Sequence, residues 1–155
     1  MINNKEYKLN IPDISLLDLE RNPVNLKSYE GKKTIIAFFP GAFTGGCTEE
    51  LCNFQSDLEE FNNLNVQIVG ISVDSPFALT GWAQANGITF DLLSDYKKEC
   101  IKLFDVEFHG LAGMEGYVSS TRAVFIADSS GEITYKWIAE NPGVLPDFEE
   151  IKKNL

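Results

Sequence analysis

The sequence is poor in the residues that build disulfide scaffolds, membrane spans and nucleic-acid surfaces. Its three cysteines among 155 residues are too few, and odd in number, for a disulfide framework. No apolar run approaches the roughly 18 residues that a transmembrane helix needs, so we expect no membrane contact. Lys and Arg number 13 against 23 Asp and Glu. The resulting net charge of −10 disfavours nucleic acid as a partner.

The amino-terminal residues also lack the features of a targeting segment. Residues 1–6 contain no apolar h-region, so we expect no signal peptide. A cytoplasmic protein with mostly reduced thiols is the corresponding expectation.

Positive charge is unevenly distributed along the chain. Residues 34–96 contain no Lys, Arg or His, although Cys47 and Cys52 both lie there. The whole chain has two arginines, Arg21 and Arg122, and one histidine, His109. A cation that tunes either thiol must therefore come from another part of the chain.

Apolar runs rich in β-branched residues alternate with segments of helical periodicity. The pattern predicts one domain over residues 1–155, of the α/β class, with a central mixed sheet between two helical layers. A small flavodoxin-like domain would give a similar order of elements, but the final hairpin favours a thioredoxin-like α/β/α sandwich. Residues 106–120 read as a glycine-containing loop. We expect strands over 34–39, 66–73, 90–94, 122–128 and 132–138, and helices over 47–64, 75–87 and from residue 146. A further helix would be capped by Asp95 and run through Phe104.

The segment 39–47 joins the first buried strand to the first long helix. Ligands of open α/β sheets bind at the carboxyl ends of the strands, which is where this segment lies. Cys47 would lie in the first helical turn, where the helix dipole and unpaired backbone N–H groups favour a thiolate. Thr44 or Gly46 would lie near the N-cap, with Glu49 and Glu50 in the first turn. The alternative is that Cys47 is a small buried apolar residue.

Arg122 interrupts an apolar run that otherwise reads as a buried strand. A guanidinium there needs an anionic partner or access to water. It could reach solvent at the edge of the strand. Alternatively, it supplies the cation that the surroundings of Cys47 lack, binding both the thiolate and an oxygen-rich substrate.

These residues resemble the active site of the peroxiredoxins. The pattern Pro40-x-x-x-Thr44-x-x-Cys47, followed by Arg122 at the start of a later strand, is similar to the motif of that family. Residues 38–47 are particularly similar to its AhpE-like branch. The spacing Cys47-x-x-x-x-Cys52 is similar to the PrxQ branch, that of the bacterioferritin comigratory protein.

The resemblance implies a thioredoxin-like fold that reduces hydroperoxides without a metal, haem or flavin. Cys47 would attack the peroxide and become a sulfenic acid. Thr44, the Cys47 backbone N–H and Arg122 would stabilise the developing charge, and Pro40 would shield the thiolate from water. Glu50 would hold Arg122 in place, unless it is a solvated carboxylate on the helix face. The reductant would be thioredoxin-like or a low-molecular-weight thiol, and the protein a monomer or homodimer.

Cys52 is the expected resolving thiol. If both cysteines stay in a regular helix, their Cα atoms are about 8.7 Å apart. That exceeds the roughly 7 Å that a disulfide tolerates, so the helix would have to unwind locally. The alternatives are a one-cysteine peroxidase resolved by an external thiol, or a peroxide sensor or holdase. We expect Cys100 to pack as a small apolar group and His109 to lie on the surface, with no metal site.

Overall fold

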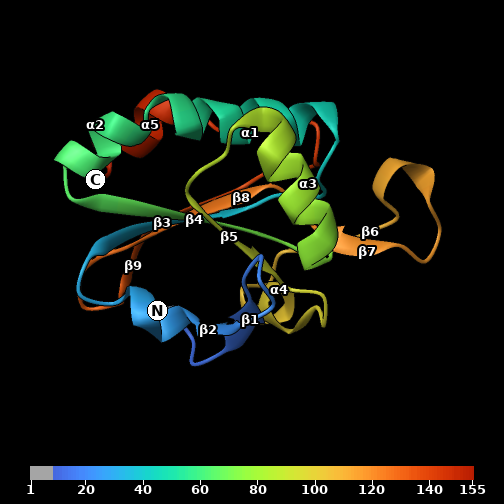
Figure 1. Ribbon diagram of the computed structural model, residues 1–155, viewed down its shortest axis with the longest axis horizontal. Helices are drawn as coiled ribbons and strands as arrows, with labels where there is room; N and C mark the ends of the chain where they lie inside the picture. Colours follow the sequence, from blue (N-terminus) through green and yellow to red (C-terminus); the bar gives the residue numbers. More distant parts are fainter. Residues whose placement is uncertain (1–8) are drawn as a thin grey trace, which may run out of the picture.

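A seven-stranded mixed sheet forms the centre of the molecule in a computed structural model that describes residues 9–155 (Figure 1). Its strand order is β2-β1-β5-β4-β3-β8-β9. Strands β3, β4 and β5 are parallel, whereas β8 is antiparallel to both β3 and β9. The strands are β1 (Ser15–Leu17), β2 (Pro23–Asn25), β3 (Lys33–Phe38), β4 (Val66–Ser72), β5 (Asp91–Ser94), β8 (Ala123–Ala127) and β9 (Ile133–Ile138).

Helices cover both faces of this sheet (Figure 1). Helices α1, α2, α3 and α5 pack on one face, and α4 lies with the 3-10 helix η1 on the other. Alternate residues of β3 face opposite sides: Ile35 and Ala37 belong to one apolar core, Ile36 and Phe38 to the other. The bounds are η1 (Leu26–Tyr29), α1 (Gly45–Ser56), α2 (Leu58–Asn63), α3 (Pro76–Asn86), α4 (Glu99–Leu103), η2 (Leu111–Gly113) and α5 (Phe148–Lys153).

The three-layer α/β arrangement agrees with the sequence, and several boundaries do as well. Helix α3 begins as predicted, because the Ser75 hydroxyl accepts a hydrogen bond from the Ala78 backbone N–H and Pro76 occupies the first turn. It ends at Gly87, whose φ of +65° is a left-handed conformation that glycine adopts without strain.

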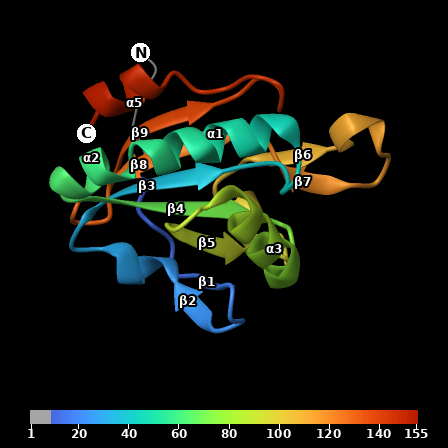
Figure 2. The same cartoon turned by 45° about the horizontal axis from the view of Figure 1, so that its top comes forward.

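Three predictions about the elements are wrong. Residues 106–120 are not simply a loop, because β6 (Glu107–His109) pairs with β7 (Val118–Ser120) in a hairpin that projects beyond the sheet (Figure 2). The helix expected over 47–64 begins at Gly45 and is broken at Asp57. The helix expected to run through Phe104 is shorter, because α4 begins only at Glu99, although the Asp95 carboxylate accepts hydrogen bonds from the Cys100 and Ile101 backbone N–H groups as expected of a capping residue.

The structure bears on the expectation about membranes but not on the expectation about a signal peptide. Within residues 9–155, no helix is both long enough and apolar enough to cross a bilayer. The prediction that residues 1–6 contain no signal peptide lies outside the described residues.

Candidate active site

Strand pairing brings Arg122 close to the loop that leads to Cys47. Strand β3 ends at Phe38, and a short loop leads from it to α1, where Cys47 is the third residue. Phe38 pairs with Ala123 in the antiparallel β3–β8 ladder, so Arg122 lies beside the start of that loop. The two segments are far apart in sequence but meet at the carboxyl ends of the parallel strands, where the sequence predicted a site.

Arg122 is buried and lies against the first turn of α1. Its side chain is only 3% exposed, and its Nη1 donates a 2.7 Å hydrogen bond to Oε2 of Glu50. Its Nε and Nη2 both donate to the carbonyl oxygen of Pro142, at 3.2 and 2.8 Å. A Cβ atom added to Gly46 would lie 2.9 Å from Nη2, so the guanidinium nearly touches the backbone one residue before Cys47. Arg122 therefore does not extend into solvent at the strand edge.

Glu50 is a buried ion-pair partner, not a solvated carboxylate. Its side chain is 0% exposed. Burial raises its pKa to about 7, and this effect outweighs the lowering by Arg122. Among the described residues, its Oε1 atom has no hydrogen-bond partner. The expected contact with Arg122 is present, but Glu49 and Glu50 fall outside the first turn because α1 begins at Gly45.

The loop before α1 is held by side chains at the end of β4. The Asp74 carboxylate accepts hydrogen bonds from the Ala42 backbone N–H at 2.8 Å and from the Ser72 hydroxyl at 2.7 Å. Phe43 has a left-handed φ of +64° and is 65% exposed. The contact of Asp74 with the loop was not predicted, although a polar Ser72-x-Asp74 pair at the end of a buried strand is a recognisable signal.

Thr44 and Pro40 lie on the loop as the sequence predicted. Thr44 occupies the N-cap position of α1, but its side chain makes no capping hydrogen bond. Its hydroxyl instead donates to the Gly41 carbonyl at 2.8 Å. Pro40 is buried. Both residues thus lie within a few positions of Cys47, on a loop fixed at both ends.

The remaining cysteines have different surroundings. Cys52 is half-buried in α1, and the helix runs without interruption from Gly45 to Ser56, so it contains both Cys47 and Cys52. Cys100 is completely buried in the opposite core, and burial raises the pKa of its thiol far above the ordinary range. Cys100 therefore packs as the small apolar group that the sequence predicted.

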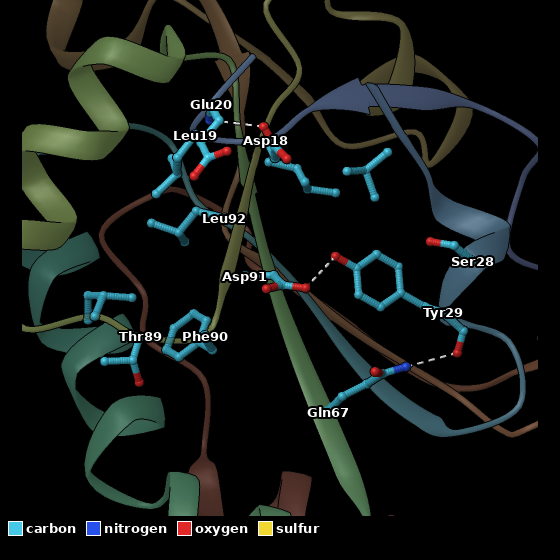
Figure 3. A pocket seen from close by; sticks show the side chains of 13 residues that line it. Asp18, Leu19, Glu20, Ser28, Tyr29, Gln67, Thr89, Phe90, Asp91 and Leu92 are labelled. Carbon is cyan, nitrogen blue, oxygen red and sulfur yellow. Dashed lines mark hydrogen bonds between the residues drawn. The ribbon is translucent and has the colours of Figure 1, made fainter. Parts of the chain in front are cut away.

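Within the part of the chain that the structure describes, no cluster of metal-ligating side chains accompanies the site. His109 is exposed and lies 3.2 Å from the Glu107 carboxylate. No three His, Cys, Asp or Glu side chains within residues 9–155 are grouped to hold a metal ion. A pocket of about 420 Å³ lies at the amino ends of β4 and β5, away from Cys47, where Tyr29 donates a hydrogen bond to Asp91 at 2.8 Å (Figure 3).

Comparison with known proteins decides the family. The sequence profile of the AhpC/TSA family matches residues 8–136. The chain belongs to this family. A thiol peroxidase of Oceanobacillus iheyensis is 34% identical over 148 residues, covering 93% of this chain and 84% of that protein. Peroxiredoxin Bcp of Escherichia coli K12 is 30% identical over 129 residues, or 80% of each protein.

Solved structures support the same assignment. The bacterioferritin comigratory protein of Xanthomonas campestris is 25% identical, with a TM-score of 0.76 over 87% of this chain and 89% of that one. The peroxiredoxin has the expected thioredoxin-like fold, and its relatives include the branch that the Cys47–Cys52 spacing indicated. It is therefore an enzyme of the thiol peroxidase type.

Proposed function

We propose that this peroxiredoxin reduces hydrogen peroxide and organic hydroperoxides through a sulfenic acid on Cys47. The observation that supports this most directly is the buried Arg122 guanidinium, which lies against Gly46 in the first turn of the helix that contains Cys47. A nearby cation and a helix N-terminus both lower the pKa of a thiol. The Xanthomonas campestris relative has alkyl peroxide reduction activity, which supports organic hydroperoxides as substrates.

The proposed chemical step needs no cofactor. The Cys47 thiolate attacks the terminal peroxide oxygen, the O–O bond breaks, and the products are the sulfenic acid and an alcohol or water after the leaving oxygen takes a proton. Arg122 and the Cys47 backbone N–H stabilise the charge that develops on the leaving oxygen. Because the Thr44 hydroxyl donates to Gly41, its lone pairs can accept the peroxide O–H and orient the substrate. Pro40 limits access of water to the thiolate.

Resolution by Cys52 would require α1 to change conformation. The Cys52 thiol would condense with the sulfenic acid to give a disulfide and water. Five helical residues separate the Cα atoms by about 8.7 Å, so the first turns of α1 must unwind before the bond forms. Glu50 lies between the two cysteines, so unwinding also breaks its 2.7 Å ion pair with Arg122. The alternative with an intact helix is reduction of Cys47 by an external thiol.

Stopped-flow kinetics test the peroxidase proposal. Reduced wild type is mixed with hydrogen peroxide or cumene hydroperoxide and compared with Cys47→Ser. Cys100→Ala is the matched control, because Cys100 is buried on the other side of the sheet. We expect Cys47→Ser to abolish rapid consumption and Cys100→Ala to preserve it. Consumption by wild type as slow as that of a free thiol would instead favour a peroxide sensor or holdase.

Mass spectrometry after one equivalent of peroxide tests the resolving step. A peptide with a Cys47–Cys52 disulfide is expected from wild type and from Cys100→Ala, and a persistent sulfenic acid from Cys52→Ser. Persistent sulfenic acid in wild type would favour the one-cysteine mechanism. The first outcome supports a thioredoxin-like reductant, and the second a low-molecular-weight thiol. Sedimentation of both redox forms distinguishes the monomer from the homodimer.

A further inference from the structure

A tight turn after β9 lies directly on the Arg122 side chain. The Pro142 carbonyl oxygen accepts two hydrogen bonds from the guanidinium, from Nη2 at 2.8 Å and from Nε at 3.2 Å. Glu50 binds Nη1 at 2.7 Å. The turn and the carboxylate thus hold different nitrogens of one planar group, which fixes its orientation as well as its position.

The turn is rigid for local reasons. The Asn141 side-chain oxygen accepts a hydrogen bond from the Gly143 N–H at 3.0 Å, and the Asn141 carbonyl accepts one from the Val144 N–H at 3.2 Å. Pro142 fixes its own φ and has no N–H that could compete for these acceptors. The direction of the Pro142 carbonyl is therefore set within four residues.

The segment that carries the turn is also tied to Arg122 through the backbone. The Ala139 N–H donates to the Arg122 carbonyl at 2.9 Å, where β8 and β9 come to their common end. Arg122 and the turn thus belong to one part of the sheet, whereas Glu50 belongs to α1. Of the two contacts, the one with Glu50 depends on α1 keeping its helical form and the one with Pro142 does not.

We propose that the turn of residues 141–144 is a positioning element of the peroxidase site, in which the Pro142 carbonyl holds the Arg122 guanidinium beside the first turn of α1. This inference rests on the peroxidase function proposed above. It gives the site an anchor for Arg122 that carries no charge and that persists when Glu50 moves away. Pro142 acts through Arg122 and does not itself touch the peroxide.

The chain provides a matched control for the test. It contains two Asn-Pro dipeptides, 22–23 and 141–142, and Pro23 is exposed on β2 at the opposite edge of the sheet. Pro142→Gly keeps the carbonyl but frees the backbone, and Pro23→Gly makes the same change elsewhere. Because misplacement of about 1 Å can cost a hundredfold in rate, we expect Pro142→Gly to lower the second-order rate constant with hydrogen peroxide on the order of tenfold. Pro23→Gly should leave it unchanged.

The pH profile distinguishes positioning from general loosening. Alkylation of Cys47 by iodoacetamide is followed from pH 4 to 9, and Pro142→Gly should shift the thiol midpoint to higher pH, with no shift for Pro23→Gly. Urea midpoints are recorded for both variants. If Pro142→Gly does not fold, Asn141→Ala removes the hydrogen bond to Gly143 and is held to the same expectations.

A double-mutant cycle with Arg122→Gln gives the decisive result. If the turn acts through Arg122, adding Pro142→Gly to Arg122→Gln lowers the rate no further. The inference is overturned if Pro142→Gly and Arg122→Gln lower the rate independently, so that their effects multiply, or if Pro142→Gly leaves the pH profile unshifted. Neither result would affect the test of the peroxidase function by Cys47→Ser. Full activity in Cys47→Ser would instead overturn the role of Cys47, and consumption by wild type as slow as that of a free thiol would overturn the peroxidase function itself.

Discussion

Replacement of Glu50 by Gln should destabilise the folded protein at pH 4 and stabilise it at pH 8. The folded protein raises the pKa of Glu50 from an ordinary 4.5 to about 7, because the buried carboxylate loses its hydration. Between these values the folded state keeps a proton that the unfolded chain has released. The contribution of Glu50 to stability is therefore fully present below pH 4.5 and is lost as pH rises through 7.

The size of the effect follows from the same interval. One pKa unit corresponds to about 1.36 kcal/mol, so ionised Glu50 costs about 3 kcal/mol at pH 8 relative to pH below 4.5. Glutamine cannot ionise, so Glu50→Gln avoids this cost. However, its buried amide would occupy the position of Oε1, which has no hydrogen-bond partner in the described residues. An unsatisfied buried amide destabilises the folded state by about 1 kcal/mol. Glu50→Gln should therefore be about 1 kcal/mol less stable than wild type at pH 4, about equal to wild type at pH 5 and about 2 kcal/mol more stable at pH 8.

Urea denaturation of the reduced protein at pH 4, 5, 6, 7 and 8 measures this difference. Glu49→Gln is the matched control, because Glu49 is exposed on the same helix, and its stability should run parallel to that of wild type. A crossing of the wild-type and Glu50→Gln curves is the expected result. A Glu50→Gln deficit that stays constant at every pH would refute the reasoning, because it would mean that Arg122 fully compensates the buried charge.

Other predictions concern the glycines of α1 and the accessibility of the thiols. Gly46→Ala places a Cβ 2.9 Å from the present position of the Arg122 Nη2, so the peroxide rate constant should fall at least tenfold. Gly45→Ala is the control, because a Cβ at Gly45 would meet no atom within 4 Å, and its rate constant should be near normal. Equal rate constants for the two variants in stopped-flow assays would contradict the proposed placement of Arg122. In the native reduced protein, a thiol reagent such as DTNB should modify half-buried Cys52 and leave Cys100 unmodified until the chain unfolds, as peptide mapping would show.

The central strands were predictable because their residues are apolar on both faces. The runs at 34–39 and 66–73 form β3 and β4, with boundaries shifted by one residue. Short continuous runs rich in β-branched residues are typical of strands that are buried on both faces. The β6–β7 hairpin was missed because its two three-residue strands show no apolar alternation and their connection is rich in glycine. Pairing with a neighbouring strand, and not local preference, makes those residues extended.

In the candidate site, the residues that are close together in sequence could also be predicted better than the contacts between distant segments. Pro40, Thr44 and Cys47 were identifiable because they lie close together in sequence and their side chains carry the chemistry. Arg122 could be proposed because a lone guanidinium within an apolar strand requires an explanation. The burial of Glu50 remained open, since one exposed and one buried carboxylate are adjacent in the sequence, and only the rotation of α1 decides which faces Arg122.

The Pro142 contact lay beyond sequence reasoning for a different reason. A backbone carbonyl is present at every residue, so no residue type marks the one that receives the guanidinium. What selects Pro142 is the course of the chain after β9, which returns over the end of β8 and is fixed there by the Ala139–Arg122 hydrogen bond. A buried Arg needs acceptors for several N–H groups, and a single carboxylate leaves part of that requirement unmet. The neutral acceptor is therefore the part of the site that lets the guanidinium stay buried whether or not Glu50 carries its charge.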